Sequence, residues 1–397
     1  MNNIKHIGSK SKAIFFIILL LLCAAGLGFS ESVNTPPVSA QYTGKGGLHT
    51  ANNKGFSVLY TNPGALYSVE TETAFSELTL NMSGPIFDIA SVVVQSMEGE
   101  MNKILATSQV QDLIRGLYAS LDIVGPLYFG YIGNGLGFGV INSTNVTFTN
   151  PQSMLVQADI SETVNLYGGY SFRIPLPQTW NSSLDAGFML KALLKGETGL
   201  NKSLLEIPAL FESVSADLLM EQEFTFTSGI GADAGILYQY GNIFSFGIAA
   251  RDIYTPTFNH HYTSLSSFLD GNETPEAENS RYPFILQSGV RIQPPLGNLN
   301  KYISNVNIYI DYNDIFGYFT HRATYKHPLL YAGIGTELTL LEVLSLRTGF
   351  YEGLFNAGLG LDLTIFNLQA SMYGRELSTE PGMRSVYNFC IGFEFRM

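Results

Sequence analysis

The last thirteen residues, SVYNFCIGFEFRM (385–397), alternate between two kinds of side chain. Every second residue is apolar and most of these are aromatic; the set is Tyr387, Phe389, Ile391, Phe393, Phe395 and Met397. The residues between them are small, polar or charged. Successive side chains of a strand point to opposite faces, so this pattern predicts a β-strand with two unlike surroundings. Chain ends usually fray, and a strand this apolar needs partners that hold it.

The composition restricts what those surroundings are. The 397 residues are 46% hydrophobic and 14% charged, whereas about a quarter of the residues in an average soluble domain are charged. Low charge with high apolar content indicates a membrane protein or an unusually apolar soluble one. No Pro/Ser-rich linker divides the body of the chain into domains.

The N-terminus has the features of a secretory signal peptide. Three lysines precede an apolar run over residues 13–25, and residues 28–30 supply the small side chains of a cleavage site. The run is too short for a convincing membrane anchor. Residues 1–30 are therefore predicted to be a cleaved signal peptide. Lipidation of Cys23 is the less favoured alternative, because Leu22 suits that reaction poorly.

Removing the signal changes the formal net charge from −12 to −15, because three lysines and no acid leave with it. So acidic a chain has no electrostatic attraction to nucleic acid. Cys390 remains as a single cysteine, so no intramolecular disulfide is expected. The rest of the chain has no apolar stretch of about 18 residues, the length of a spanning helix. An exported apolar chain without such a helix can still enter a bilayer as a closed β-barrel.

Internal segments repeat the alternation of the C-terminus. Apolar side chains alternate with Gly, Ser, Asn and isolated charges in PFILQSGVRIQ (283–293), NVNIYIDY (305–312) and LFNAGLGLDLTIF (354–366). A soluble sandwich would turn Lys and Glu toward water on its second face, whereas a barrel lumen is lined in this way. Fourteen candidate strands result: 66–81, 126–132, 135–147, 155–173, 183–196, 222–240, 243–257, 283–293, 304–313, 329–340, 343–352, 354–365, 367–376 and 385–397.

The connections between these strands differ by parity. Most odd-numbered ones are long, namely 82–125, 197–221, 258–282 and 314–328. Most even-numbered ones are tight, at 133–134, 241–242, 341–342 and 367, with moderate exceptions at 174–182 and 294–303. Short periplasmic turns and long external loops are typical of bacterial barrels, whose strand number is even. The sequence therefore predicts an all-β, antiparallel transmembrane barrel of about 14 strands.

Closure of such a barrel explains the terminal strand, because the last strand must pair with the first. Bacterial outer-membrane proteins also tend to end in an aromatic strand that the barrel-assembly machinery reads. The candidate residues for this signal are Tyr387, Phe389, Phe393 and Phe395.

Three segments with helical periodicity lie in the long connections, at residues 85–106, 108–121 and 203–219. They are expected in extracellular loops. Their apolar stripes either pack over the mouth of the barrel or form a vestibule in which an apolar ligand first lands.

Residues 31–65 are too many for a simple tail before the first strand, and they end in YTNPGAL (60–66). Asn62, Pro63 and Gly64 resemble the hatch sequence of the FadL-like outer-membrane long-chain fatty-acid transporters, in which alanine follows Asn-Pro. The layout also resembles PorV-like barrels, relatives that serve secretion. The resemblance implies a hatch over 31–65 that plugs a barrel over 66–397. It also implies that an apolar molecule is caught outside and leaves the lumen sideways into the membrane.

A carboxylate cargo needs a cationic partner in a lumen of low dielectric constant. The candidate ligand-binding residues are the inward-phase arginines Arg251, Arg291 and Arg347. Alternatively, these arginines pair with lumen acids and tie the plug to the wall; the acids are Asp252, Asp311, Glu337, Asp362 and Glu394. The alternating glycines at 133, 135, 137 and 139 leave room for ligand or plug, or relieve crowding near a turn.

Catalysis has little support, because neither HExxH nor GxSxG occurs. His260 and His261 precede several acids, but a solvated loop is the preferred interpretation, so no metal, cofactor or enzyme activity is predicted. The first function class is uptake of hydrophobic small molecules such as fatty acids by a monomer in the bacterial outer membrane, in contact with its lipid. The second is a PorV-like secretion or surface-interaction barrel. A general porin is third, because residues 31–65 would fill its lumen.

Overall fold

The computed structural model describes residues 36–85, 117–152, 155–203, 219–320 and 325–397. Within these ranges, sixteen strands form one antiparallel sheet. Fourteen of the described strands, β1–β7 and β10–β16, close into a ring, because β16 pairs with β1 and β5 pairs with β6. The predicted barrel of 14 antiparallel strands is confirmed.

The strands are long on one side of the ring and short on the other. Strands β1–β7 span Glu72–Ser83, Tyr118–Gly133, Leu136–Gln152, Leu155–Ile174, Ser182–Ser203, Phe224–Tyr240 and Phe244–Tyr254. Strands β8–β16 span Pro256–Tyr262, Glu276–Arg281, Ile285–Ile292, Ile303–Tyr312, Ala332–Leu340, Leu344–Tyr351, Leu354–Leu363, Phe366–Glu376 and Ser385–Arg396. The short helices are α2 (Ala40–Thr43), α3 (Val58–Thr61), α9 (Leu265–Asp270), α10 (Gly317–Thr320), η1 (Pro63–Tyr67), η2 (Gln178–Trp180), η3 (Gly297–Lys301) and η4 (Pro328–Tyr331).

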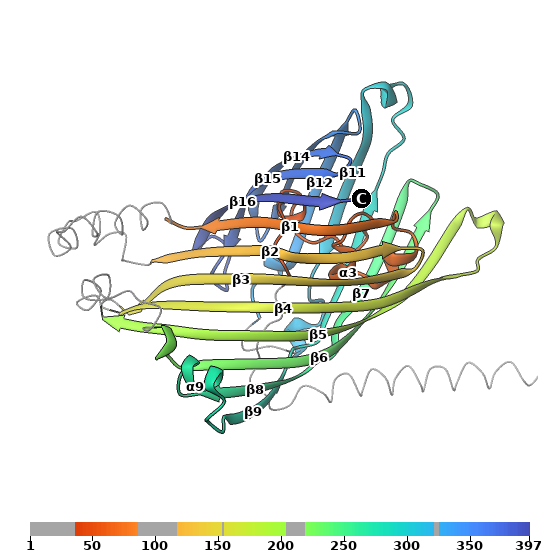
Figure 1. Cartoon of the computed structure of the whole chain (residues 1–397). Coiled ribbons are helices and arrows are strands. Elements are labelled where there is room, and N and C mark those ends of the chain that lie inside the picture. The colour runs from red at the N-terminus through yellow and green to blue at the C-terminus, as the bar shows by residue number, and fades with distance from the viewer. Residues whose placement is uncertain (1–35, 86–116, 153–154, 204–218, 321–324) are drawn as a thin grey trace, which may run out of the picture.

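The two ends of the barrel carry different connections (Figure 1). The end that holds the C-terminus has short turns, among them Leu341-Glu342, where both residues adopt positive φ. At the opposite end, the connections after β1 and β5 are longer in sequence, and residues 86–116 and 204–218 of these connections lie outside the described ranges. This asymmetry has the predicted parity. The β14–β15 turn is at Thr364-Ile365, so its placement at Asn367 was wrong; Asn367 lies in β15 opposite Asp362.

The start of β2 corrects another expectation. β2 begins at Tyr118, so the end of the helix predicted over 108–121 is a strand. Tyr118 and Leu121 are three positions apart, as on one face of a helix, but on β2 they belong to opposite faces of the strand, and pairing with β3 decides for the strand. The other predicted helices, 85–106 and 203–219, fall almost entirely outside the described residues. The first strand, predicted over 66–81, is β1 and begins only at Glu72, because residues 63–67 belong to η1.

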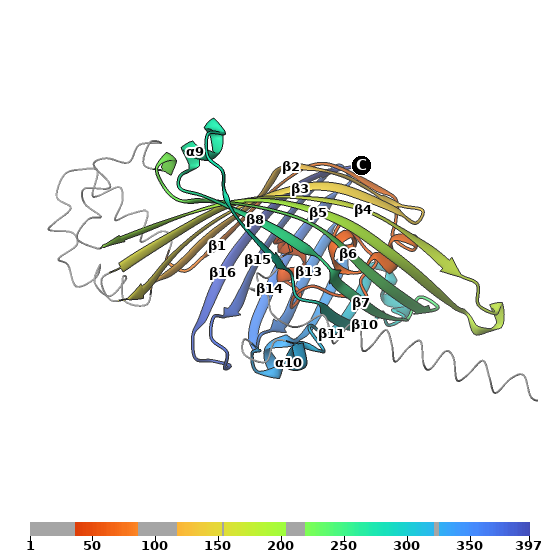
Figure 2. The same cartoon turned by 90° about the horizontal axis from the view of Figure 1, so that it is seen from below.

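A hairpin extends the wall on the side of the long strands. Beyond the bulge at Asp252, β8 takes the place of β7 beside β6, and β9 pairs with β8 (Figure 2). The segment predicted as the loop 258–282 therefore contains β8, α9 and β9, and His260 and His261 lie in a strand. No helix in the described part of the chain is long and apolar enough to cross a membrane.

The terminal strand is held on both sides, by β1 and β15. Backbone hydrogen bonds join Thr73 N–H to the Met397 carbonyl (2.7 Å) and Met397 N–H to the Thr73 carbonyl (2.8 Å). Arg396 adds an ion pair to Glu72 at 2.6 Å. The apolar end of the chain does not fray because it closes the ring.

Candidate functional site

Residues 36–71, called the plug from here on, fold inside the barrel, where Figures 1 and 2 show them as red and orange coils. The plug carries α2, α3 and η1. Its apolar side chains form a continuous buried core with the wall; the members include Phe56, Leu59, Leu66, Tyr128, Ile132, Ile141, Met189 and Leu237. Burial on this scale fixes the plug against β2–β6.

The predicted hatch residues lie at the centre of this contact. Asn62 is fully buried; its Nδ2 donates to the carbonyl oxygens of Thr50 (2.8 Å) and Ile236 (3.1 Å). Its Oδ1 accepts a hydrogen bond from Gly64 N–H at 2.9 Å, which caps η1. A Cβ at Gly64 would lie 2.9 Å from the backbone of β6, so glycine rather than alanine fits here.

Inward-facing glycines let the plug backbone touch the wall. A Cβ at Gly335 would overlap the Lys45 carbonyl oxygen, and one at Gly187 would overlap the Pro63 carbonyl oxygen. A Cβ at Gly137 would meet the side chains of Leu59 and Leu66. The two interpretations of the glycine series therefore each apply to one part of it, and at Gly137 the missing side chain makes room for the plug. The other part lies in the β2–β3 turn, where Gly133 and Gly135 adopt positive φ.

Polar ties hold the plug to β10–β13. His49 Nδ1 lies 2.6 Å from Asp311 Oδ2, and its Nε2 lies 2.8 Å from the Lys45 carbonyl oxygen. The other Asp311 oxygen accepts from Thr50 N–H at 2.6 Å. Gln287 Nε2 donates to the Thr61 carbonyl at 2.8 Å. These contacts were not predicted, because alternation shows which way a wall residue faces but not which plug residue it meets.

Two of the three candidate arginines, Arg347 and Arg291, lie in the part of the lumen that the plug fills. Arg347 Nε donates to Glu337 at 2.7 Å, and Arg347 also bonds to Gln369 at 3.2 Å. Arg291 donates to Ser245 Oγ at 3.0 Å and to Asn53 of the plug. The Arg347–Glu337 pair is the arrangement that the alternative interpretation described, in which lumen arginines pair with lumen acids.

Lys45 of the plug lies near the same acid, with its Nζ 3.9 Å from Glu337. Burial lowers the pKa of Lys45 to about 8, although the carboxylate of Glu337 opposes the shift.

The third arginine has different surroundings. Arg251 is 6% exposed, and it makes no hydrogen bond or ion pair with any residue in the described ranges; its Nε is buried without a partner. The neighbouring Asp252 lies 2.9 Å from Lys191 Nζ, and Lys191 also binds Asp233 at 2.8 Å. Two acids and two cations therefore balance in charge, while the hydrogen-bond donors of Arg251 stay unused.

A cavity of about 800 Å³ lies between the plug and the long-loop end, and Arg251 lines it. Its size is that of a site for a drug-sized molecule. One wall, from β2–β5, is mostly hydroxyl and amide: Ser120, Ser143, Asn145, Thr147, Ser161 and Thr163. The facing side is apolar and aromatic, with Val38, Leu48, Tyr282, Ile285, Leu330 and Tyr331. Charged side chains complete the lining: the cations Arg251, Lys195, Lys326 and Arg375, and the acids Asp122, Asp314 and Glu352. The cavity is therefore amphipathic and carries charges of both signs.

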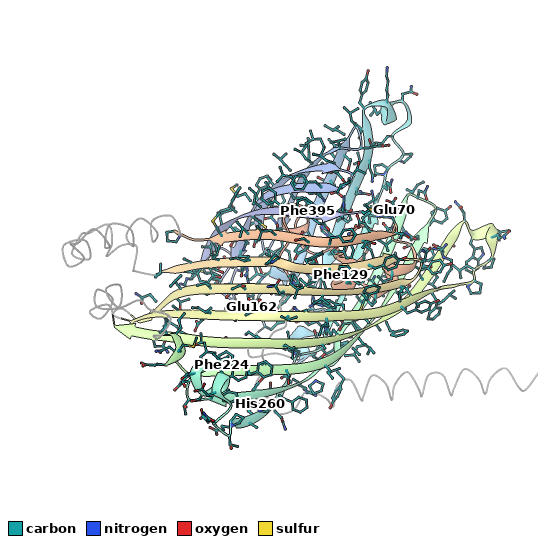
Figure 3. All side chains as sticks on the ribbon, in the orientation of Figure 1. Glu70, Phe129, Glu162, Phe224, His260 and Phe395 are labelled. Carbon is teal, nitrogen blue, oxygen red and sulfur yellow. The ribbon has the colours of Figure 1, made fainter. Side chains whose placement is uncertain are left out.

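The outward surface of the barrel is apolar. Figure 3 labels Phe129 on β2 and Phe395 on β16, and both are about half exposed, at 46% and 49%. The wall is irregular between β1 and β2, because strand pairing stops after Ala74 and resumes at Thr79. Among the described residues, no group of three or more His, Cys, Asp and Glu side chains could hold a metal ion.

No protein-family model matches the sequence, and no curated protein matches it. Among solved structures, the chain is similar to the Ralstonia pickettii toluene transporter TbuX (11% identity, 92% of this chain and 99% of that one, TM-score 0.49). It is also similar to the Pseudomonas putida toluene transporter TodX (12%, 92% and 99%, TM-score 0.42) and to a Pseudomonas aeruginosa FadL homologue (12%, 93% and 99%, TM-score 0.43). At these identities and scores, the likeness says nothing of the ligand.

Proposed function

We propose that this chain is an outer-membrane channel, not an enzyme, that takes up hydrophobic molecules with an acidic head, such as long-chain fatty acids. The observation that carries the proposal is Arg251, whose donors are unused at the border of an amphipathic cavity. A carboxylate is the natural partner of such a guanidinium, because the pair is charge-assisted and can be bidentate. Leu48 and Ile285 line the same cavity and offer apolar surface to a chain.

An outer-membrane location is supported by the outward apolar surface of the ring that β1–β7 and β10–β16 close. In that setting, the bilayer lipid surrounds the barrel, and the aromatic terminal strand acts as the assembly signal. The monomer suffices for this function, because one chain encloses the cavity.

The proposed exit is sideways through the wall. A path straight along the barrel axis is blocked by the plug, whose apolar core and backbone contacts fill the lumen near the short turns. The break in β1–β2 pairing between Ala74 and Thr79 is the favoured place, because Val124 beside it lines the cavity. Fewer ladder hydrogen bonds have to be broken there.

The test is binding of a labelled long-chain fatty acid to purified protein, for wild type, Arg251→Gln and the control Arg291→Gln. The control removes another buried arginine, one that contacts the plug and does not line the cavity. Arg251→Gln should weaken binding by about tenfold or more, equal to about 1.4 kcal/mol, the low end for a charged hydrogen bond. Binding of the methyl ester should change little in either variant. Equal binding by all three proteins would exclude this role of Arg251.

The second candidate function is a PorV-like secretion or surface-interaction barrel. The β8–β9 hairpin favours it, because this hairpin carries the wall beyond the closed ring and exposes the outer edge of β9. Co-purification of a secreted or envelope protein, lost on deletion of residues 256–281, would support this function. Fatty-acid binding with no such partner would favour the channel.

A further inference from the structure

A second cavity lies on the outside of the barrel. It has a volume of about 380 Å³ and crosses β7 and β10–β13 near the long-loop end. Large outward side chains line it, among them Phe246, Ile310, Ile334 and Phe350. Leu329 of η4 lines it as well. This trough is separate from the lumen cavity and from Arg251.

Small residues make the trough. Ala332 and Ser288 replace bulky side chains at outward positions, and Gly289 and Gly333 bring only backbone to the floor. Asp311 lies between these two glycines but turns its carboxylate inward to His49. Backbone therefore forms part of the floor, together with the side chains of Val290 and Tyr312, and the plug is anchored behind Asp311.

We infer that this trough binds one acyl chain of a membrane phospholipid. Its bordering side chains belong to the outward apolar surface; Ile334 and Phe350 are 46% and 52% exposed, so in the membrane the bilayer supplies what covers them. The trough crosses four strand spacings, about 19 Å, which is comparable to an extended acyl chain. Leu329 of η4 adds a further apolar side chain to its lining. An acyl chain bound there contacts β11, the strand that carries Asp311.

The experiment uses the whole purified protein in vesicles of phosphatidylethanolamine and phosphatidylglycerol. A phospholipid with a diazirine on one acyl chain is activated by light, and the labelled peptides are identified by mass spectrometry. Residues 285–292, 303–312 and 332–340 should be labelled more strongly than the equally outward segments of β14 and β15. Excess unlabelled phospholipid should reduce this labelling.

Two variants separate a site from general lipid contact. Ala332→Trp fills the trough, whereas Ala370→Trp changes an outward alanine on β15, away from it. Labelling of the trough should fall about tenfold in the first, equal to about 1.4 kcal/mol, and stay unchanged in the second. Leu329→Ser removes an apolar side chain from the lining and should lower the labelling of the trough as well. This variant replaces Ala332→Trp in the test if Ala332→Trp fails to assemble.

Uniform labelling along all outward strands, unchanged by the variants, would overturn the inference. A diazirine fatty acid forms a second arm. Labelling by this free acid alone would also overturn it, because the trough would then take cargo rather than bilayer lipid.

Discussion

The two halves of the lumen are built in opposite ways. In the half near the short turns, the plug contacts the wall through apolar packing, through backbone contact at glycines such as Gly335, and through the pair His49–Asp311. Toward the long loops, the lumen holds a cavity of about 800 Å³, and Arg251 lines it with unused donors. Buried polar atoms without a partner also occur in the plug, among them those of Tyr42, Thr50 and Asn52. The contrast therefore lies in the open volume beside Arg251, where an unpaired donor is available to a ligand.

The largest effect is expected where the plug backbone touches the wall. In Gly335→Val, the added side chain overlaps the Lys45 carbonyl oxygen, so the plug must move or the strand must bend. Such overpacking costs about 1–3 kcal/mol or more. The variant should show steady ion conductance in a planar bilayer, where the wild type shows little. Gly168→Val is the control, because nothing lies within 4 Å of its added Cβ; equal conductance in both would contradict the plug contact.

A smaller loss is expected from Asn62→Ala. It removes three hydrogen bonds and leaves the buried carbonyls of Thr50 and Ile236 without this donor. The free energy of unfolding should fall by about 3 kcal/mol, measured by denaturant titration of the barrel in vesicles. Asn279→Ala, on the exposed strand β9, should change it by less than about 0.5 kcal/mol. Matching values for the two variants would show that the hatch residue does not hold the plug.

The tie between His49 and Asp311 can be measured by a double-mutant cycle with His49→Ala and Asp311→Ala. The atoms lie 2.6 Å apart and both side chains are buried, so the coupling free energy should be about 2 kcal/mol. Additive single effects would indicate that the plug does not depend on this pair.

The smallest effect belongs to the open half. Thr163→Val replaces a hydroxyl on the polar wall of the cavity by a methyl group of similar size. The free energy of unfolding should change by less than about 0.5 kcal/mol, and fatty-acid affinity by less than about threefold. A large loss of stability would mean that this wall is as tightly satisfied as the plug.

How much was predictable differs between the wall and its contents. Strand number and inward or outward phase follow from alternation, which is local and has a period of two. Arg347 and Glu337 were therefore predicted to face the lumen, with ligand binding by Arg347 as the first interpretation and pairing with a lumen acid as the alternative. Local pattern was misleading where helical spacing occurred in a strand, as at Tyr118 and Leu121, and where a strand was interpreted as a loop, as at His260.

The sequence by itself determined a barrel of 14 strands, the difference between its two ends, and a terminal strand that must be paired. The tertiary structure alone decided which side chains meet. His49 and Asp311 are 262 positions apart, and only the path of the plug through the closed ring brings them together. Among the residues that the structure describes, the same path left Arg251 Nε without a partner beside a cavity, while Arg291 gained Asn53. The physical reason is that facing direction is set by each strand, whereas partnership depends on closure, register and the course of the plug.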